Sequence, residues 1–137
     1  IHIDREYPTS SMANISASPD DTENFTLLMK DIRAAIGDQK ELTLATVASA
    51  KYIDFKAILP FINFVNIMAY DMASAPKHHS ALYRSANSGG ITSDEAVTAH
   101  LKAGVPPSML VTEMCIRDSG DAFLWSWRRW IPQFPGF

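Results

Sequence analysis

Residues 64–72 read FVNIMAYDM and form an almost continuous apolar run in which Tyr70 and Asp71 follow the last core positions. A strand has this composition when both faces of its sheet are covered, because neither side then meets water. Sheets covered on both faces are typical of parallel α/β proteins, in which helices connect successive strands. The run therefore predicts a buried strand of a parallel sheet, with a polar pair where the strand ends.

Strands and helices alternate on both sides of this run. Further strands are predicted at 1–6, 42–47 and within 104–112, and helices between them at 19–36, 54–62 and 93–103. Regular alternation of strands and helices is typical of parallel βαβ units and places the chain in the α/β class. The pattern leaves open whether the sheet is doubly wound or part of a barrel.

The predicted helices carry suitable residues at their ends. Ser18, Asp54 and Ser93 are predicted N-caps, because their side chains can accept hydrogen bonds from the free backbone N–H groups of a first turn. Gly37 is a predicted C-terminal cap. The first helix has an apolar stripe at helical spacing, formed by Phe25, Leu28, Met29, Ile32 and Ile36.

Polar groups at the carboxyl ends of parallel strands gather on one rim of the sheet, where we expect Asp4, Glu6, Tyr70 and Asp71. Asp4 and Glu6 alternate with Ile3 and Arg5, so both side chains point the same way, with Cα atoms roughly 6–7 Å apart. Two close carboxylates repel, and a carboxyl that keeps its proton in a cleft can act as a general acid. A solvated acidic strand end is the alternative.

Two motifs resemble those of one enzyme family. The stretch IDREYP at 3–8 resembles the DxDxDWEYP signature of glycoside hydrolase family 18, the chitinase family, and FVNIMAYD at 64–71 resembles its sixth-strand motif. Three further stretches resemble segments of the family and occur in the same order: NFTLLMKDIRAAIG, LTLATVAS and SDEAVTAHLKAGVPPSMLV. The resemblance covers residues 1–112 and runs from the family's fourth strand to its seventh.

The resemblance implies a fold and a reaction. The fold is a partial (β/α)8 TIM barrel, and the reaction is hydrolysis of β-1,4-linked N-acetylglucosamine polymers such as chitin. In this family the 2-acetamido oxygen of the substrate is the nucleophile, so the mechanism is substrate-assisted and retaining. Carried over by position, Glu6 is the general acid/base and Asp4 orients the acetamido group. No metal or organic cofactor is implied.

The resemblance also implies substrate contacts at the second motif. Tyr70 would donate a hydrogen bond to the acetamido oxygen with the assistance of Asp71, and Met68 and Tyr7 would line the sugar subsite. Ordinary core packing is the alternative for Met68 and Tyr70. At the level of the whole protein, the alternative is a non-catalytic chitin- or oligosaccharide-binding relative, and the retained Glu6 argues against it.

Two residues depart from the family signature. His2 stands where the signature has an aspartate two residues before the one that Asp4 matches, and these two aspartates normally share a proton. We expect this loss to impair proton handling. Arg5 stands where the family usually has Trp, on the strand face opposite Glu6, and we expect a cation there to disturb packing.

The end of the chain departs from the family altogether. Residues 114–119, MCIRDS, are the translation of a transposon mosaic end used in sequencing libraries, so we predict that 113–137 are an artefactual, non-family tail. Its rival interpretation is an amphipathic helix or sugar platform built on the aromatic residues Phe123, Trp127, Trp130 and Phe134. A complete barrel takes about 250 residues. We therefore expect a truncated reading frame that neither folds stably alone nor hydrolyses a substrate.

The composition limits which classes of binding partner we expect. With 47% hydrophobic residues, 20% charged residues and a net charge of −3, the chain is typical of a globular domain and has no excess of cations for nucleic acid or an anionic membrane. No apolar run in the sequence is long enough to span a bilayer. The predicted partner is an N-acetylglucosamine-containing polysaccharide or oligosaccharide, with no nucleic acid and no membrane. By resemblance, the parent protein is secreted or periplasmic.

Overall fold

The computed structural model describes residues 1–11 and 14–113, so the predicted tail and its aromatic residues lie outside the described residues. The strands in this part are β1 (His2–Ile3), β2 (Thr43–Val47), β3 (Phe64–Met68) and β4 (Leu110–Glu113). The helices are α1 (Asp21–Ile36), α2 (Phe55–Ile58) and α3 (Ser93–Lys102), with short 3-10 helices η1 (Leu59–Phe61) and η2 (Pro107–Met109). The predicted alternation of strands and helices is confirmed.

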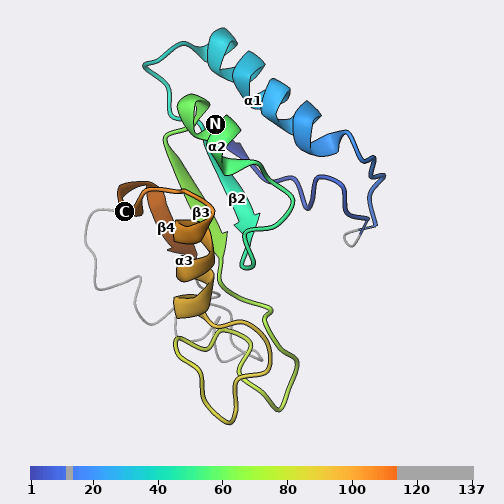
Figure 1. The fold of residues 1–137 in the computed structure, drawn as a ribbon, viewed down its shortest axis with the longest axis vertical. Coiled ribbons are helices and arrows are strands. Elements are labelled where there is room, and N and C mark those ends of the chain that lie inside the picture. Colours follow the sequence, from blue (N-terminus) through green and yellow to red (C-terminus); the bar gives the residue numbers. More distant parts are fainter. Residues whose placement is uncertain (12–13, 114–137) are drawn as a thin grey trace, which may run out of the picture.

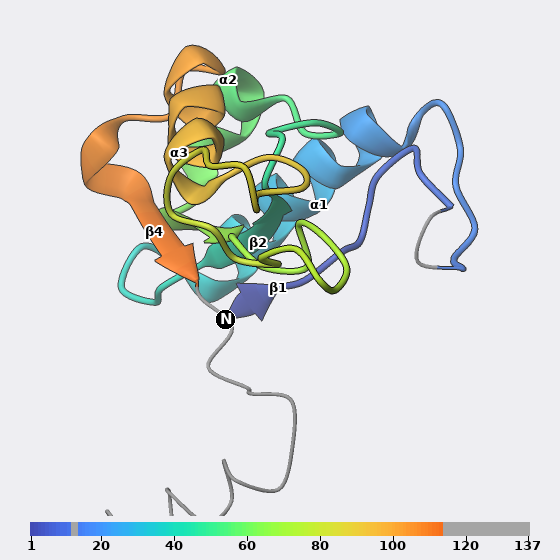
Figure 2. The same cartoon turned by 90° about the horizontal axis from the view of Figure 1, so that it is seen from below.

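The four strands form one parallel sheet whose spatial order, β1-β2-β3-β4, is also the chain order. Because right-handed crossovers then all step the same way, the connecting helices lie on one face of the sheet. Figure 2 shows α1, α2 and α3 together on one side of the strands. A doubly wound sheet reverses its strand order and carries helices on both faces. The described sheet is therefore singly wound, as in part of a barrel.

The core fills the space between the sheet and the helices. Its main cluster consists of Phe25, Met29, Leu42, Leu44, Phe55, Ile58, Ile62, Val65 and Val105. A smaller cluster, made of Ala48, Ile67 and Ala96, joins β2 and β3 to α3. Phe25 and Met29 confirm the predicted stripe of α1, but Leu28 is 47% exposed, so the buried face of this helix is narrower than predicted.

Two predicted helix caps are confirmed. The Asp54 side chain accepts a hydrogen bond of 3.1 Å from the N–H of Ala57 and so caps α2. Gly37 ends α1 with φ of 71°, and its N–H donates to the Arg33 carbonyl at 3.0 Å. The left-handed backbone at this position explains the glycine, since side chains with a Cβ rarely adopt it.

Two other predicted caps are wrong by one or two residues. Thr92, not Ser93, caps α3, because the Thr92 hydroxyl accepts from the Glu95 N–H while the Glu95 carboxylate accepts from the Thr92 N–H. At α1 the N-cap is Asp20, which makes no side-chain cap. The predicted cap Ser18 lies just outside the helix and accepts from the N–H of Asp20 at 3.3 Å.

The first strand is shorter than predicted. Only His2 and Ile3 form ladder pairs with β2, and the chain then leaves the sheet. Arg5 turns to the loop before α1, where its guanidinium donates to the Ser16 carbonyl at 3.1 Å and to Asp21 at 3.4 Å. The Arg5 side chain is 37% exposed and has these polar partners, so its charge lies at the surface, and the expected disturbance of packing stays a prediction.

The long connection between β3 and α3 covers the carboxyl end of the sheet, as the lower part of Figure 1 shows. It is held together by its own backbone: the Met72 N–H donates to the His79 carbonyl at 2.8 Å, and the His78 N–H to the Asn87 carbonyl at 2.9 Å. A Cβ at Gly90 would lie 2.3 Å from the Met72 carbonyl oxygen, so only glycine permits this close approach.

Candidate active site

Most of the predicted site residues meet in one cleft at the carboxyl rim of the sheet. The cleft has a volume of about 390 Å³ and is lined by Glu6, Tyr7, Val47, Ala48, Ser49, Met68, Tyr70, Asp71, Met72 and Ile91. Apart from Ile91, which precedes α3, these residues end or follow β1, β2 and β3, and the three strands end side by side because they are parallel. The two motifs, at 3–8 and 64–71, are far apart in the sequence but line the same cleft.

Glu6 is held by its chain neighbour. The Tyr7 hydroxyl donates a hydrogen bond of 2.7 Å to Oε2 of Glu6. The Tyr7 ring in turn stacks on Tyr52, with ring centroids 5.6 Å apart and an interplanar angle of 17°. Burial, the hydrogen bond to Glu6 and the negative charges of Glu6 and Asp4 raise the pKa of Tyr7 well above its usual range. Tyr7 therefore stays a hydrogen-bond donor at neutral pH.

Tyr70 lies among carboxylates. Burial is the main cause that raises the pKa of Tyr70. The negative charges of Glu113, Asp4, Glu6 and Asp71 raise it further. Asp4 is exposed and is not among the residues that line the cleft, but its negative charge helps to raise the pKa of both Tyr7 and Tyr70. The site therefore combines several carboxylates with two phenols that remain un-ionised.

Met68 and Asp71 take different positions at the end of β3. Met68 is 7% exposed and pairs in register with Val47 on one side and Glu113 on the other, so it both packs and lines the cleft. Asp71 follows with φ of 54°, and its side chain is 87% exposed. His79 contacts it, since Nδ1 of His79 lies 3.4 Å from the backbone N and 3.8 Å from the carboxylate of Asp71.

The chemistry of this cleft follows from its charge. An anionic, partly buried site stabilises positive charge that develops on a neutral molecule and repels anionic ligands. Within residues 1–11 and 14–113, no group of three or more His, Cys, Asp or Glu side chains is placed to hold a metal ion. Among the helices of the same part, none has the length and apolar character needed to cross a membrane.

Sequence reasoning missed two polar residues of the site. Ser49 lines the cleft just after β2, and Glu113 ends β4 and acts electrostatically on Tyr70. Both stand at the carboxyl end of a predicted strand, which is the signal that pointed to Glu6 and Asp71. Applying the same rule to all four strands identifies them.

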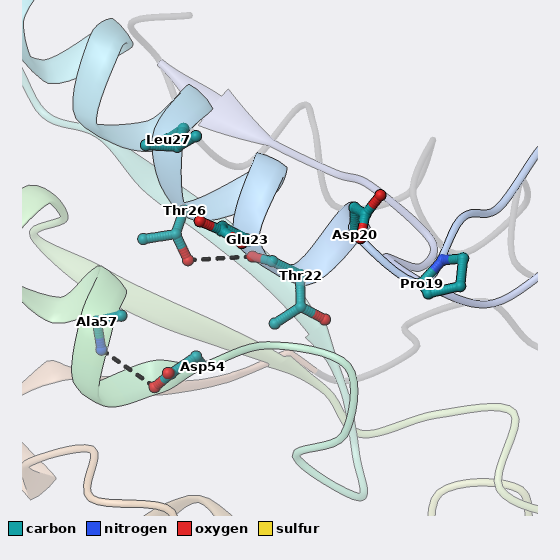
Figure 3. A pocket seen from close by; sticks show the side chains of 8 residues that line it. All are labelled: Pro19, Asp20, Thr22, Glu23, Thr26, Leu27, Asp54 and Ala57. Atoms are coloured by element: carbon teal, nitrogen blue, oxygen red, sulfur yellow. Dashed lines mark hydrogen bonds between the residues drawn. The ribbon is translucent and has the colours of Figure 1, made fainter.

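A second hollow, of about 500 Å³, lies between the first turns of α1 and α2 and is lined by Pro19, Asp20, Thr22, Glu23, Thr26, Leu27, Asp54 and Ala57. Figure 3 shows that two of its polar side chains, those of Thr26 and Asp54, bond to the backbone of their own helices. The Thr26 hydroxyl donates to the Thr22 carbonyl, and Asp54 accepts from Ala57. The hollow is larger than the cleft but shares no lining residue with it.

A singly wound parallel sheet with polar residues gathered at its carboxyl rim is typical of (β/α)8 barrels. The family model described as Glycosyl hydrolases family 18 matches residues 1–122. The chain belongs to this family. The match runs past residue 112, where the resemblance in the sequence analysis ends.

Known proteins with similar sequence or structure include chitinases and an N-acetylglucosaminidase. Chitinase A1 of Niallia circulans is 34% identical, and the match covers 81% of this chain and 19% of that protein. The chitinase domain of the spore coat protein CotE from Clostridium difficile is 35% identical, with a TM-score of 0.78 over 83% of this chain and 36% of that one. A family 18 N-acetylglucosaminidase from Paenibacillus barengoltzii is 33% identical, with a TM-score of 0.74 over 81% and 37%.

The coverages show how much of each relative this chain matches. The chain spans about a fifth of the length of Chitinase A1 and little more than a third of the two solved chains. The predicted fold class is confirmed: the described residues form an α/β unit with a parallel sheet, which is a partial (β/α)8 barrel.

Proposed function

We propose that this chain carries the general acid and the substrate-orienting residues of an enzyme that hydrolyses β-1,4-linked N-acetylglucosamine polymers such as chitin. The observation that carries the proposal is the cleft in which Tyr7 donates a hydrogen bond to Glu6, and which Tyr70 and the carboxylate of Asp71 also line. Family membership supports a glycosidic substrate, and the names chitinase and N-acetylglucosaminidase of the relatives support the N-acetylated sugar.

In the first step, protonated Glu6 gives its proton to the glycosidic oxygen as the bond from that oxygen to the anomeric carbon breaks. The carbonyl oxygen of the substrate's own 2-acetamido group forms a new bond to the anomeric carbon, and the departing sugar leaves as an alcohol. Because Tyr7 occupies Oε2 of Glu6, the other carboxyl oxygen remains to carry the proton.

The intermediate of this step is an oxazolinium ion, whose positive charge suits the anionic cleft. Asp4 accepts a hydrogen bond from the acetamido N–H and stabilises the charge that develops there. Tyr70, whose raised pKa keeps its proton in place, donates to the acetamido oxygen, and Asp71 assists. Met68 and Tyr7 contact the sugar ring from the cleft wall.

In the second step, the Glu6 carboxylate takes a proton from a water molecule as the water oxygen attacks the anomeric carbon. The bond between that carbon and the acetamido oxygen breaks, which restores the acetamido group and returns Glu6 to its protonated form. Two displacements at one carbon retain its configuration. We expect the isolated 137-residue chain to be inactive, because it spans only about a fifth of Chitinase A1 and little more than a third of the similar solved chains, whereas a complete barrel takes about 250 residues.

The test compares two substrates in the full-length protein that contains this sequence. N-acetylglucosamine oligomers are expected to be cleaved with retention of configuration, whereas glucosamine oligomers, which lack the acetyl group, are expected to remain intact. Equal cleavage of both oligomers contradicts substrate assistance. Tight binding of the acetylated oligomer without cleavage contradicts the enzyme and favours the non-catalytic, sugar-binding alternative.

A further inference from the structure

Two residues of the loop that follows β2 adopt a left-handed backbone although neither is glycine. Ala50 has φ of 57° and Tyr52 has φ of 73°. Residues with a Cβ rarely adopt this conformation, and they keep it only where the surrounding structure holds them. The loop lies at the carboxyl rim, directly after the cleft residue Ser49. Strained residues cluster at such places when a side chain must be held in one position.

The backbone of Tyr52 is anchored to α1. The Thr22 hydroxyl donates a hydrogen bond of 3.1 Å to the Tyr52 carbonyl. The residue before Thr22, Asp21, accepts from the Arg5 guanidinium at 3.4 Å, and Arg5 directly precedes Glu6 in the chain. The first turn of α1 therefore contacts both the loop after β2 and the segment that carries Glu6.

The side chain of Tyr52 contacts Tyr7 behind the cleft wall. The two rings stack with centroids 5.6 Å apart and an interplanar angle of 17°. Tyr52 is half-buried and is not among the residues that line the cleft, whereas Tyr7 lines it and donates a hydrogen bond of 2.7 Å to Glu6. Contacts thus run from Thr22 through the two tyrosine rings to the carboxylate of Glu6.

We propose that Tyr52 is a positioning residue for the general acid Glu6 and acts through Tyr7, without a contact of its own to the sugar. Stacked aromatic rings prefer a defined geometry, so the ring of Tyr52 restrains the ring of Tyr7. The Tyr7 hydroxyl then stays directed at Oε2 of Glu6, and the other carboxyl oxygen stays directed at the glycosidic bond. The inference rests on the proposed function, because proton transfer requires a fixed orientation of the acid.

Two substitutions at Tyr52 in the full-length protein test this role on N-acetylglucosamine oligomers. Tyr52→Leu removes the ring and is expected to lower kcat about fivefold with KM within about twofold of the wild type. Tyr52→Phe keeps a ring over Tyr7 and is expected to retain kcat within about twofold. A raised KM with unchanged kcat in Tyr52→Leu assigns Tyr52 to sugar binding and overturns the inference. Equal losses of kcat in both variants also overturn it, because the stacked ring is then not the cause.

A double-mutant cycle separates positioning from a general loss of stability. Tyr7→Phe removes the hydroxyl through which Tyr52 acts, so adding Tyr52→Leu to Tyr7→Phe is expected to lower kcat by less than about twofold. If Tyr52→Leu lowers kcat about fivefold both in the wild type and in Tyr7→Phe, Tyr52 does not act through the bond from Tyr7 to Glu6, and the inference fails.

A pair of substitutions on α1 tests the same contacts without altering either ring. Thr22→Val removes the hydroxyl that anchors Tyr52, keeps the shape of the side chain and is expected to lower kcat about threefold. Thr22→Ser keeps the hydroxyl and is expected to match the wild type. Equal kcat in Thr22→Val and Thr22→Ser overturns the inference.

The proposed function fails separately from the role of Tyr52. Turnover that survives Glu6→Gln removes the proposed function. Loss of turnover in Glu6→Gln together with wild-type kcat in Tyr52→Leu removes the role of Tyr52 alone.

Discussion

The phenolic hydroxyl of Tyr7 donates a hydrogen bond of 2.7 Å to Oε2 of Glu6, the residue before it in the chain. Two consecutive residues thus supply both the acid of the proposed reaction and the group that holds it. The stacking of Tyr7 on Tyr52 orients the phenol, because Tyr52 lies in a segment that α1 contacts through the Thr22 hydroxyl. The position of Glu6 therefore depends on residues far from it in the sequence.

Tyr7→Phe is expected to lower kcat about tenfold, because a hydrogen bond to a charged group is lost while the ring and its stacking remain. Steady-state kinetics on N-acetylglucosamine oligomers measure the effect. Tyr83→Phe is the matched control, since Tyr83 is 66% exposed and does not line the cleft. Equal kcat in Tyr7→Phe and the wild type contradicts the role of Tyr7.

His100 makes the stability of the protein depend on acid pH. It is fully buried, with Nδ1 at 2.8 Å from the Ala96 carbonyl and Nε2 at 2.6 Å from the Thr46 hydroxyl. Burial lowers the pKa of His100 below its usual value of 6.5, although the bond to Ala96 opposes this. The contribution of neutral His100 is complete above pH 6.5 and declines below it, because the unfolded chain then binds a proton that the folded chain resists.

Thermal unfolding of the full-length protein is expected to show this decline between about pH 7.5 and about pH 5.5. His100→Gln is expected to lower the midpoint at the higher pH and to reduce its dependence on pH. The control is His78→Gln at an exposed loop position, which is expected to retain the dependence of the wild type. An unchanged pH dependence in His100→Gln refutes the assignment to His100.

Arg33 joins the end of α1 to the start of two strands. Its guanidinium donates to the carbonyls of Phe61, Gly37 and Lys40 at 2.8, 2.8 and 2.7 Å, and to the Asn63 amide oxygen at 2.6 Å. Arg33→Lys is expected to cost about 2 kcal/mol of unfolding free energy, because one ammonium cannot satisfy acceptors in four directions. Denaturant unfolding of Arg33→Lys and the wild type measures this loss of unfolding free energy.

The matched control for that change is Arg84→Lys. Arg84 pairs with Glu95 and donates to the Gly90 carbonyl at the surface, where its side chain is 54% exposed, and exposed ion pairs contribute little. We expect a loss below about 1 kcal/mol. If Arg33→Lys and Arg84→Lys lower the unfolding free energy equally, the hydrogen bonds of Arg33 do not stabilise the contact between α1 and the two strands.

The capping box of α3 gives a further prediction. Thr92→Ala removes the hydroxyl that accepts from the Glu95 N–H and is expected to destabilise the protein by about 1 kcal/mol. Thr92→Ser keeps the hydroxyl and is expected to remain close to the wild type. A loss of equal size in both variants would assign the effect to the methyl group of Thr92, and the cap would then contribute nothing.

Local patterns predicted the strands and the rim of the site. The apolar run around Val65 and Ile67 is buried on both faces, and the rule that parallel strands end at one rim brought Glu6 and Tyr70 together. The cap of α3 was also readable, since Thr92 stands three residues before Glu95 in the capping-box pattern.

Contacts between distant segments could not be read in the same way. The pairing of Arg5 with Asp21 depends on how the loop before α1 folds back. The bond of His2 to Asn66 joins residues 64 positions apart and depends on the register of three strands. Such contacts depend on tertiary structure, and no local periodicity encodes them.

The central claim is that Glu6 is the general acid/base. Turnover of N-acetylglucosamine oligomers by the full-length protein is expected to fall by about 10²–10⁴-fold in Glu6→Gln, which keeps the shape of the side chain but cannot exchange a proton. Glu23→Gln, at an exposed position of α1, is the matched control and is expected to retain wild-type turnover. Turnover in Glu6→Gln equal to that of Glu23→Gln would contradict the claim.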